Sequence, residues 1–353
     1  MAGLTQLRAL GARPVRGAAS NDEMRFARSA GWILGLALLA GGCAKQAPVA
    51  QPAVALRKVV LQTDWFPQAE HGGFYQALAK GFYREAGLDV EIRPGGPGTT
   101  IKLSVAKGIA DFGMYRSDDV IVAASRGLPL IMVAAVLQHD PEALLVHEAS
   151  PVQTLADLNG RSVIAPPSMT WIPYVKKKYG IAFDLRPLNY GLAVFLADPE
   201  AIQQCMMTSE PYFAEQHGVK VRTVPLASSG YDTYHTLICR RELVRTSPDM
   251  VKAFVAASIR GWHDYLEGDP APAHALILAR NSQMSAGQLA YSRQALIAHA
   301  LVTGDPARNE HIGKLSIKRI QQQIDVLTEM KILEVPVTAA GVATRAFLPT
   351  NAR

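Results

Sequence analysis

Apolar and polar positions alternate along residues 58–138 in a repeating order of short strands and amphipathic helices. The run KVVLQTDW at 58–65 predicts a strand that ends in polar and aromatic residues, and LDVEIRPGG at 88–96 predicts a second strand. Between them, the run at 72–87 places apolar residues at the spacing of one helical face and ends in Gly87. Because the alternation continues to a buried strand at 128–138, it predicts a mostly parallel sheet covered by helices.

The same pattern restarts near residue 149. RSVIAP at 161–166 predicts a strand, TWIPYVKKKYG at 170–180 predicts a helix, and residues 248–331 are largely helical in pattern. Two such units and a helical tail predict an α/β protein of two lobes, each a mostly parallel sheet flanked by helices. The expected limits are 58–148 for the first lobe, 149–235 for the second, and 236–353 for a return to the first lobe with the C-terminal helices.

Residues 24–43 have the pattern of a bacterial lipoprotein signal. Arg25 and Arg28 precede a short apolar core at 33–40, and small residues then lead to Cys43. The apolar run is too short to favour a transmembrane anchor. The sequence therefore predicts cleavage before Cys43, a lipid on its thiol, and a start at Met24. In this interpretation residues 1–43 are the signal region and residues 44–57 are a flexible tether.

Composition and charge narrow the classes of partner. Charged residues make up 19% of the 353 residues and hydrophobic residues 49%, which is typical of a globular protein. The formal charge is +6, but five Arg and two acids fall within residues 1–43, and the longest basic run elsewhere is 176–178. We therefore expect no nucleic-acid partner. The three cysteines lack the spacing of a metal or redox motif, so we expect neither a metal nor a cofactor.

Candidate ligand contacts follow from the predicted topology. Ligands of open parallel sheets bind beyond the carboxyl ends of the strands, which selects the loops at 64–73, 95–100, 114–119 and 166–172. The segments near 208–212 and 228–235 should face the same cleft. Aromatic side chains there could stack on a flat ligand, and acids could accept hydrogen bonds. Ser117 could donate to a ligand or cap the following helix. The candidates are Asp64, Trp65, His71, Tyr115, Ser117, Trp171, Tyr190, Glu210 and Tyr231.

A family resemblance extends over roughly residues 58–350. Its carriers, in this order, are DWFPQAEHGGFYQALAKGFYREAGLDVEI, PGTTIKLSVAKGIADFGM, LADLNGRSV, SEPY and GKLSIKRIQQQIDVLTEMKIL. The chain resembles type II periplasmic solute-binding proteins of ABC importers, in the branch of thiamine-pyrimidine-precursor binders and fungal thiamine-pyrimidine synthases. The resemblance implies a monomeric, extracytoplasmic clamp that captures a small molecule and delivers it to a permease in the inner membrane.

The resemblance also implies a ligand class. In that branch an Asp-Trp segment supplies a cleft aromatic, a histidine follows in the same loop, and an acid faces the ligand; the matching residues are Asp64, Trp65, His71 and Glu210. They imply a flat heterocycle similar to a thiamine pyrimidine precursor. Related binders take sulfonates, nitrate or taurine, and such anions would favour Arg or Lys instead.

The alternative from the synthase branch is an enzyme. Those enzymes use a histidine in this loop as a substrate source and carry a cysteine-rich iron-binding run before the strand that crosses back. His71 fits the first requirement. The corresponding segment here, LASSGYDTYHTLICRRELV, holds only Cys239 together with His235, which does not make a cysteine-cluster site. The sequence therefore favours a binding protein, with His71 as a ligand contact or as a residue that orients the loop.

Overall fold

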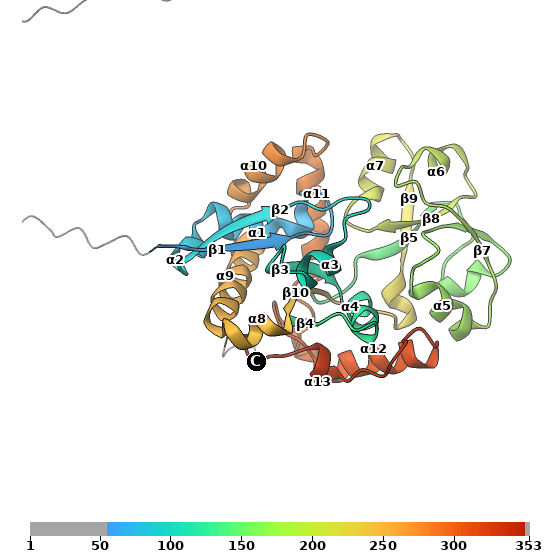
Figure 1. The fold of residues 1–353 in the computed structure, drawn as a ribbon. Helices are drawn as coiled ribbons and strands as arrows, with labels where there is room; N and C mark the ends of the chain where they lie inside the picture. Colours follow the sequence, from blue (N-terminus) through green and yellow to red (C-terminus); the bar gives the residue numbers. More distant parts are fainter. Residues whose placement is uncertain (1–54, 350–353) are drawn as a thin grey trace, which may run out of the picture. The chain divides into compact units, whose positions relative to one another are not determined.

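The computed structural model describes residues 55–349, and within them the chain forms two five-stranded sheets (Figure 1). The predicted signal at 1–43, with lipidation at Cys43, lies outside the described residues. Both sheets belong to one compact unit, Ala53–Arg353. The first sheet has the order β2 (Leu88–Arg93), β1 (Arg57–Gln62), β3 (Phe112–Arg116), β10 (His235–Arg240) and β4 (Leu130–Leu137). The second has the order β7 (Asp184–Arg186), β6 (Ser162–Ile164), β8 (Ile202–Met206), β5 (Glu142–His147) and β9 (Val221–Pro225).

The chain crosses between the sheets twice, from β4 to β5 and from β9 to β10. In each sheet the strand that follows a crossing is inserted antiparallel to its two neighbours, and the other pairings are parallel. Four of five strands in each sheet therefore run one way. β5 was not expected from the sequence, and it belongs to the second sheet although it precedes the expected limit at 148. Only residues 138–141 separate it from β4, so the crossing into the second sheet is already complete at residue 142.

Helices cover both sheets. The first lobe has α1 (Gly72–Ala79), α2 (Phe82–Glu85), α3 (Ile101–Ala106) and α4 (Ser117–Ser125), and the second has α5 (Trp171–Tyr179), α6 (Ala193–Ala197) and α7 (Glu210–Gln216). The C-terminal segment has α8 (Arg241–Thr246), α9 (Pro248–Glu267), α10 (Ala271–Arg280), α11 (Ala286–Ala298), α12 (Ile317–Glu329) and α13 (Ala339–Val342). The single helix predicted at 72–87 is two helices, because Gly81 adopts a left-handed φ of 77° that an ordinary helix cannot contain.

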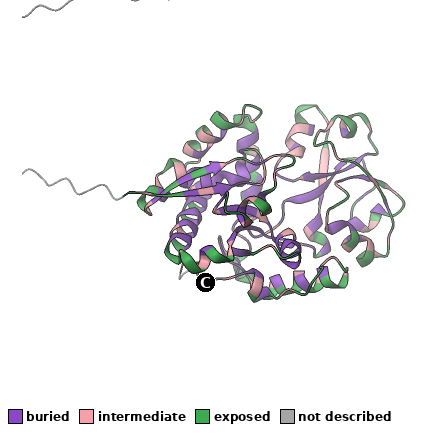
Figure 2. Cartoon of the chain, in the orientation of Figure 1, coloured by how far each residue is buried: buried purple, intermediate pink, exposed green. Residues whose placement is uncertain are grey.

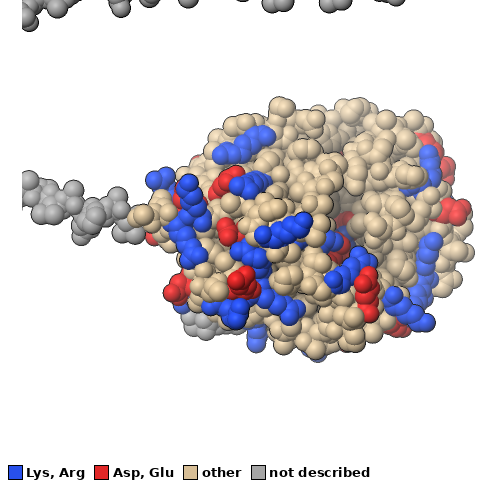
Figure 3. Space-filling view, viewed as in Figure 1, with Lys and Arg blue, Asp and Glu red and all other residues tan. Residues whose placement is uncertain are grey.

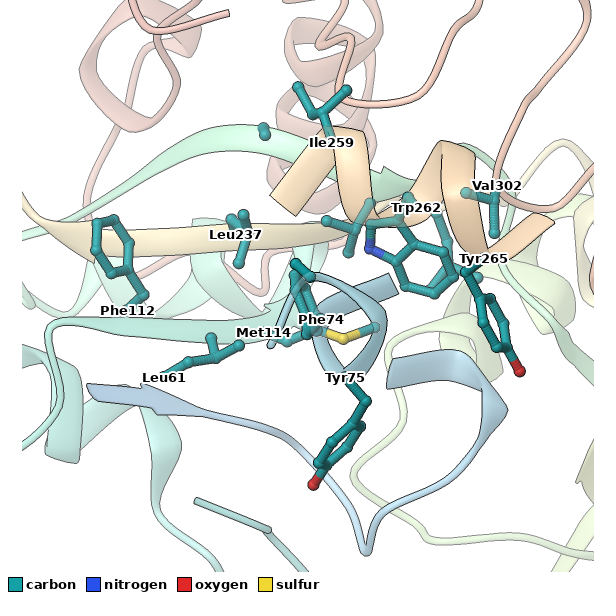
Figure 4. Close-up of a cluster of buried hydrophobic side chains, with 14 of the residues drawn as sticks. Leu61, Phe74, Tyr75, Phe112, Met114, Leu237, Ile259, Trp262, Tyr265 and Val302 are labelled. Carbon is teal, nitrogen blue, oxygen red and sulfur yellow. The ribbon is translucent and has the colours of Figure 1, made fainter. Parts of the chain in front are cut away.

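The largest apolar cluster lies between the first sheet and the helices α1 and α9. Figure 4 shows Trp262 and Tyr265 of α9 beside Phe74 of α1, with Leu61 and Leu237 contributed by strands. All five side chains are 0% exposed. Burial follows the strands and the inner helix faces, whereas exposed residues lie on the outer faces (Figure 2). This core fixes β1 and β3, whose carboxyl ends carry much of the candidate site.

Close contact between α1 and α9 depends on glycine. A Cβ at Gly261 would lie 2.2 Å from the carbonyl oxygen of Gly73, and a Cβ at Gly73 would lie 2.2 Å from the ring of Trp262. We expect Gly261→Ala to lower the free energy of unfolding by about 2 kcal/mol, because the helices must separate. Urea unfolding checks this, with Gly191→Ala as control, since a Cβ there meets nothing closer than 3.6 Å. Equal stability of the two variants would contradict the expectation.

Candidate functional site

A cavity of 580 Å³ is lined by residues of both lobes, and we call it the interlobe cavity. Its lining includes three carboxylates, Asp64, Glu70 and Glu210, and, among the described residues, no Lys or Arg. On the face in Figure 3, Lys and Arg lie mixed with acids over the left and lower-left parts, including α3 and α8, whereas the surface between α10 and α7 is tan. The interlobe cavity is therefore acidic although the chain as a whole is basic.

The loop after β1 brings Asp64 and Trp65 to this cavity. Both follow the carboxyl end of a parallel strand, where open α/β sheets contact their ligands. The backbone N–H of Gly95 donates to the carbonyl oxygen of Trp65 at 3.0 Å, and a Cβ at residue 95 would lie 2.4 Å from the carbonyl oxygen of Thr63. Glycine at 95 thus lets the loop lie directly against the end of β2.

His71 lies behind Asp64 and away from solvent. Its Nε2 is 2.8 Å from Asp64 Oδ1; the imidazole is 0% exposed and the Asp64 side chain 24% exposed. His235 Nδ1 lies 3.7 Å from the other oxygen of Asp64. Burial raises the pKa of Asp64, but the hydrogen bond with His71 and the charges of the two histidines outweigh it and hold that pKa below its ordinary value. Asp64 therefore stays ionised in the cavity wall, and His71 fixes its orientation.

Two aromatic rings from opposite lobes meet at the cavity. The centroids of Trp65 and Tyr190 are 5.3 Å apart, with an angle of 45° between the ring planes, and Phe66 packs edge-on against Trp65 at 5.7 Å. Tyr190 is 58% exposed and has a left-handed φ of 59°, which is uncommon for a bulky residue. Such strain concentrates at ligand clamps. The pair thus joins the two lobes at the interlobe cavity.

Glu210 provides an acid from the second lobe, at the start of α7. Its Oε2 accepts a hydrogen bond from the backbone N–H of Met206 at 2.8 Å, which ties the carboxyl group to the end of β8. Burial raises the pKa of Glu210 to about 7, although the bond from Met206 opposes this rise. Near neutral pH this carboxyl group is thus divided between its charged and neutral forms.

Glu70 joins the two lobes beside the cavity. Its carboxylate accepts a hydrogen bond from the hydroxyl of Thr208, which follows β8 in the second lobe. The carbonyl oxygen of Thr208 in turn accepts a bond from Ser292 of α11 at 2.6 Å. Burial raises the pKa of Glu70, and the bond from Thr208 only partly offsets this. The contact holds this end of β8 against the first lobe.

A buried ionic cluster of Arg116, Asp118, Asp140 and Glu142 lies where the lobes meet; we call it the Arg116 cluster. Arg116, at the end of β3, is 2.9 Å from Asp118, 3.8 Å from Asp140, and pairs directly with Glu142. Burial raises the pKa of Glu142 to about 8 against the opposing charge of Arg116. The pKa of Asp140 is lowered, because Arg116 and His235 outweigh its burial. One guanidinium therefore lies near three carboxyl groups, one from the first lobe (Asp118), one from the first crossing (Asp140) and one from the second lobe (Glu142).

The cluster reaches the cavity through Gln204. Its Nε2 donates to Glu142 at 2.6 Å, and its Oε1 accepts from the indole N–H of Trp171 at 3.0 Å. On the other side, Asp118 accepts hydrogen bonds from Tyr231, at 2.8 Å, and from Thr170. Asp118 belongs to the first lobe and Thr170 to the second, so these bonds also join the lobes.

The structure brings four of the nine candidates together around the interlobe cavity: Asp64, Trp65, Tyr190 and Glu210. The other five lie outside its lining. His71 stands behind Asp64, and Tyr115 packs beside Lys102, whose ammonium is 5.0 Å from the ring centroid. Ser117 donates to Gln323 at 2.7 Å, while Trp171 and Tyr231 have the internal partners given above. The side-chain donors of Ser117, Trp171 and Tyr231 are thus used within the protein.

Several lining residues were not expected from the sequence. Gln203 and Gln204 are buried in β8, and Glu70 lies one residue before His71. Two consecutive amides inside a short buried strand are a recognisable signal, because buried polar groups need partners. His235 was noted only as a neighbour of Cys239; it is 4% exposed and lines the cavity.

Residues 55–349 contain no group of three or more His, Cys, Asp or Glu side chains that is placed to hold a metal ion. The described helices include none with the length and apolar character of a membrane span. Cys205 and Cys239 are both buried free thiols, and burial raises the pKa of Cys239 to about 12.

Comparison with known proteins agrees with this architecture. The chain is 26% identical over 266 residues to the riboflavin-binding protein RibY of Chloroflexus aurantiacus, covering 72% of this chain and 74% of that one. It is 26% identical over 224 residues to the formylaminopyrimidine-binding protein of Halalkalibacterium halodurans, covering 60% of this chain and 68% of that one. The periplasmic aliphatic sulphonate binding protein SsuA of Escherichia coli superimposes with a TM-score of 0.62 at 16% identity, covering 82% and 92% of the two chains.

The family model described as "NMT1/THI5 like" matches residues 68–273, which include the Asp64 partner His71, the Arg116 cluster and Glu210. The expected fold is confirmed by the two sheets and their solved structural neighbours. The chain therefore belongs to the NMT1/THI5-like family and has the periplasmic binding protein fold.

Proposed function

We propose that this protein is the extracytoplasmic ligand-binding component of an ABC importer and captures a small flat heterocycle that is neutral or cationic, similar to a thiamine pyrimidine precursor. The observation that carries this proposal is the lining of the interlobe cavity. It combines three carboxylates with aromatic side chains and has no Lys or Arg among the described residues. Ring N–H and amino groups are the donors that such acceptors fit.

The mechanism is capture by closure. A ligand ring stacks on Trp65 of the first lobe while Glu210 of the second lobe accepts one of its N–H groups. Because each lobe supplies one contact, the ligand interacts with both only when the lobes approach, and binding shifts the population toward the closed state. Asp64 is held ionised by His71 and offers a second fixed acceptor. The permease then recognises the closed form and receives the ligand from it.

An anion such as a sulfonate, nitrate or taurine is the second candidate, suggested by structural neighbours that include sulfonate binders. The cavity lining disfavours it. A sulfonate needs Arg, Lys or backbone N–H donors, whereas Asp64, Glu70 and Glu210 would repel its charge. The names of two relatives, which refer to riboflavin and to a formylaminopyrimidine, agree with a flat nitrogen heterocycle.

The synthase alternative has support from relatives in Saccharomyces cerevisiae named 4-amino-5-hydroxymethyl-2-methylpyrimidine phosphate synthases, 25% identical over 242 residues. The position of His71 argues against it. Its imidazole is 0% exposed, lies outside the cavity lining, and is bonded to Asp64. A histidine used as a reactant must reach the cavity, so we propose that His71 positions Asp64 and that the protein binds without catalysis.

A ligand panel tests the function. We expect the melting temperature to rise with formylaminopyrimidine, riboflavin or another flat nitrogen heterocycle, and to stay unchanged with taurine or nitrate, because only a ligand of the native state stabilises it. A shift of the melting temperature with taurine or nitrate alone would show that the ligand is an anion and not a heterocycle. Synthesis of a pyrimidine phosphate by the purified protein, with loss of the imidazole of His71, would show that it is an enzyme.

Trp65→Ala should weaken binding of the heterocycle that gives the largest shift by about tenfold, because it removes the stacking surface from the first lobe. Isothermal titration checks this. Tyr115→Ala is the matched control: it also removes an aromatic ring from the first lobe, but outside the cavity lining, and we expect unchanged affinity. Equal losses in the two variants would show that Trp65 makes no special contact.

We also propose that a lipid on the thiol of Cys43 anchors the protein to the membrane. Cys43→Ala should move the protein from the membrane fraction to the soluble extracytoplasmic fraction, because a single residue carries the lipid. Fractionation of cells followed by detection of the protein checks this. Retention of the variant in the membrane fraction would exclude lipidation at Cys43 as the anchor.

A further inference from the structure

A second hollow, of 1100 Å³, lies beside the two chain crossings, and we call it the rear hollow. Gln138 and residues 231–234 line it, while Pro141 and His235 of the same two crossing segments line the interlobe cavity. The second lobe contributes Lys178 of α5 together with Ala227, Ser228 and Gly230, and the C-terminal part of the chain contributes α12 and the segment before it. The two crossing segments therefore line both hollows.

The two hollows differ in charge. Six cationic side chains line the rear hollow, against two acids, Asp232 and Glu310. The interlobe cavity has the opposite balance, with three acids and no Lys or Arg. The cations of the rear hollow are Lys178, Arg308, Lys314, Lys318, Arg319 and Arg345.

Part of this cationic lining is held in place. Lys314 is 9% exposed, and its ammonium donates to the side-chain oxygen of Asn309 at 2.6 Å. The Arg319 guanidinium lies 4.0 Å from the ring centroid of Tyr234 and 2.9 Å from Asp232. Arg319 Nη1 is buried and makes no hydrogen bond within residues 55–349. These groups are ordered before any ligand arrives, which lowers the entropy cost of binding one.

The two acids of the rear hollow already have partners. His139 lies between them, with Nδ1 2.7 Å from Asp232 and Nε2 3.0 Å from Glu310. Its hydrogen bond with Asp232 raises the pKa of His139, which favours the charged form. Lys318 and Arg345, in contrast, form no ion pair with any described residue and are exposed. Positive charge therefore remains uncompensated in the hollow.

We propose that the rear hollow is a second binding site, distinct from the interlobe cavity, and that it takes a small polyanion with closely spaced anionic oxygens, of the phosphate class. Arg and Lys are the side chains that bind such groups. Inorganic pyrophosphate in solution and the phosphate of a lipid headgroup share this chemistry. This inference is independent of the heterocycle, because the lining of the interlobe cavity has three acids and no Lys or Arg among the described residues.

Titration of the full chain with inorganic pyrophosphate tests the site. At ten times its Kd, we expect the melting temperature to rise by about 3 °C. The double variant Lys318→Gln with Arg345→Gln should bind pyrophosphate at least about tenfold more weakly, since both are charge-assisted contacts. The matched control, Lys107→Gln with Lys252→Gln, removes the same charge from exposed positions outside the hollow and should stay within about twofold.

Two further measurements make the outcome decisive. Trp65→Ala should bind pyrophosphate as the wild type does, because it changes only the interlobe cavity. Vesicles of phosphatidylglycerol, compared with vesicles of phosphatidylcholine, separate the two sources of phosphate. Binding to phosphatidylglycerol vesicles that depends on Lys318 and Arg345 assigns the site to lipid headgroups. Pyrophosphate binding without vesicle binding assigns the site to free anions. Absence of both interactions, or equal weakening in the control pair, overturns the proposal.

Discussion

Arg116→Leu should lower the free energy of unfolding by about 3–5 kcal/mol, because it leaves buried carboxyl groups without their cation. In the wild type the guanidinium contacts Asp118 and Glu142 and lies near Asp140, and these four side chains are no more than 9% exposed. A leucine fills part of the space but offers no charge. The measurement is urea unfolding of the wild type and the variant at pH 7.

The deficit should shrink as the pH falls. Arg116 holds the pKa of Asp118 and Asp140 below ordinary values despite their burial, so the stability it contributes is present above the unfolded pKa and is lost as the pH falls through the folded pKa. In the variant the same carboxyl groups become easier to protonate, and acid then relieves the buried charge. We therefore expect the two proteins to differ less at pH 4 than at pH 7.

A surface arginine provides the control. Arg126 is 55% exposed and pairs with Glu334 at 3.0 Å, so Arg126→Leu should change the free energy of unfolding by less than about 1 kcal/mol. If Arg116→Leu were as mild as this control, the Arg116 cluster would not hold the lobes together. A deficit that stayed constant from pH 7 to pH 4 would also contradict the electrostatic explanation.

The Arg116 cluster shows why the sequence predicts the fold better than the site. The local pattern around residues 112–119 correctly indicates a strand followed by a helix. It cannot indicate that Glu142 and Gln204 complete the cluster, because those partners come from strands of the other sheet. The same holds for Trp171: its place at a loop end suggested a ligand contact, but its indole N–H donates to Gln204.

The limit between the lobes illustrates a second reason. Hydrophobic periodicity identifies β4, which ends at the break Gln-His-Asp-Pro of residues 138–141. The short apolar run of β5 that follows carries no local signal of the sheet that it joins. The sheet to which β5 belongs is decided by its antiparallel pairing with β8 and β9, which are distant in sequence.

Asp64 and Trp65 were predictable for the opposite reason. The rule that ligands lie beyond the carboxyl ends of parallel strands needs only the position of β1, and β1 is evident from its apolar run. The role of His71 also depends on the side of the loop on which its imidazole lies. The hydrogen bond to Asp64 shows that side. Local signals thus identify loops, and tertiary contacts decide which side chains of a loop remain free for a ligand.

Glu210→Gln should weaken heterocycle binding by about 50-fold at pH 8, because a neutral amide replaces the charged acceptor of a ligand N–H. In the wild type the affinity should rise as the pH increases from 6 to 8. The pKa of Glu210 is about 7, and only the deprotonated carboxyl group accepts with full strength. Isothermal titration at several pH values should therefore show a midpoint near pH 7 in the wild type and none in the variant.

Stability separates this role from damage to the fold. The folded pKa of Glu210 is raised above its unfolded value, so ionisation of the buried carboxyl group costs the wild type stability as the pH rises from about 4.5 to 7. Glu210→Gln lacks this cost and should melt at a higher temperature than the wild type at pH 8, with a smaller gain at pH 5. Weaker binding by a more stable protein assigns Glu210 to the ligand. A variant that binds normally would assign the acceptor role to another acid of the interlobe cavity. A retained midpoint near pH 7 would make Glu70 the first to test, because burial raises its pKa whereas that of Asp64 is lowered.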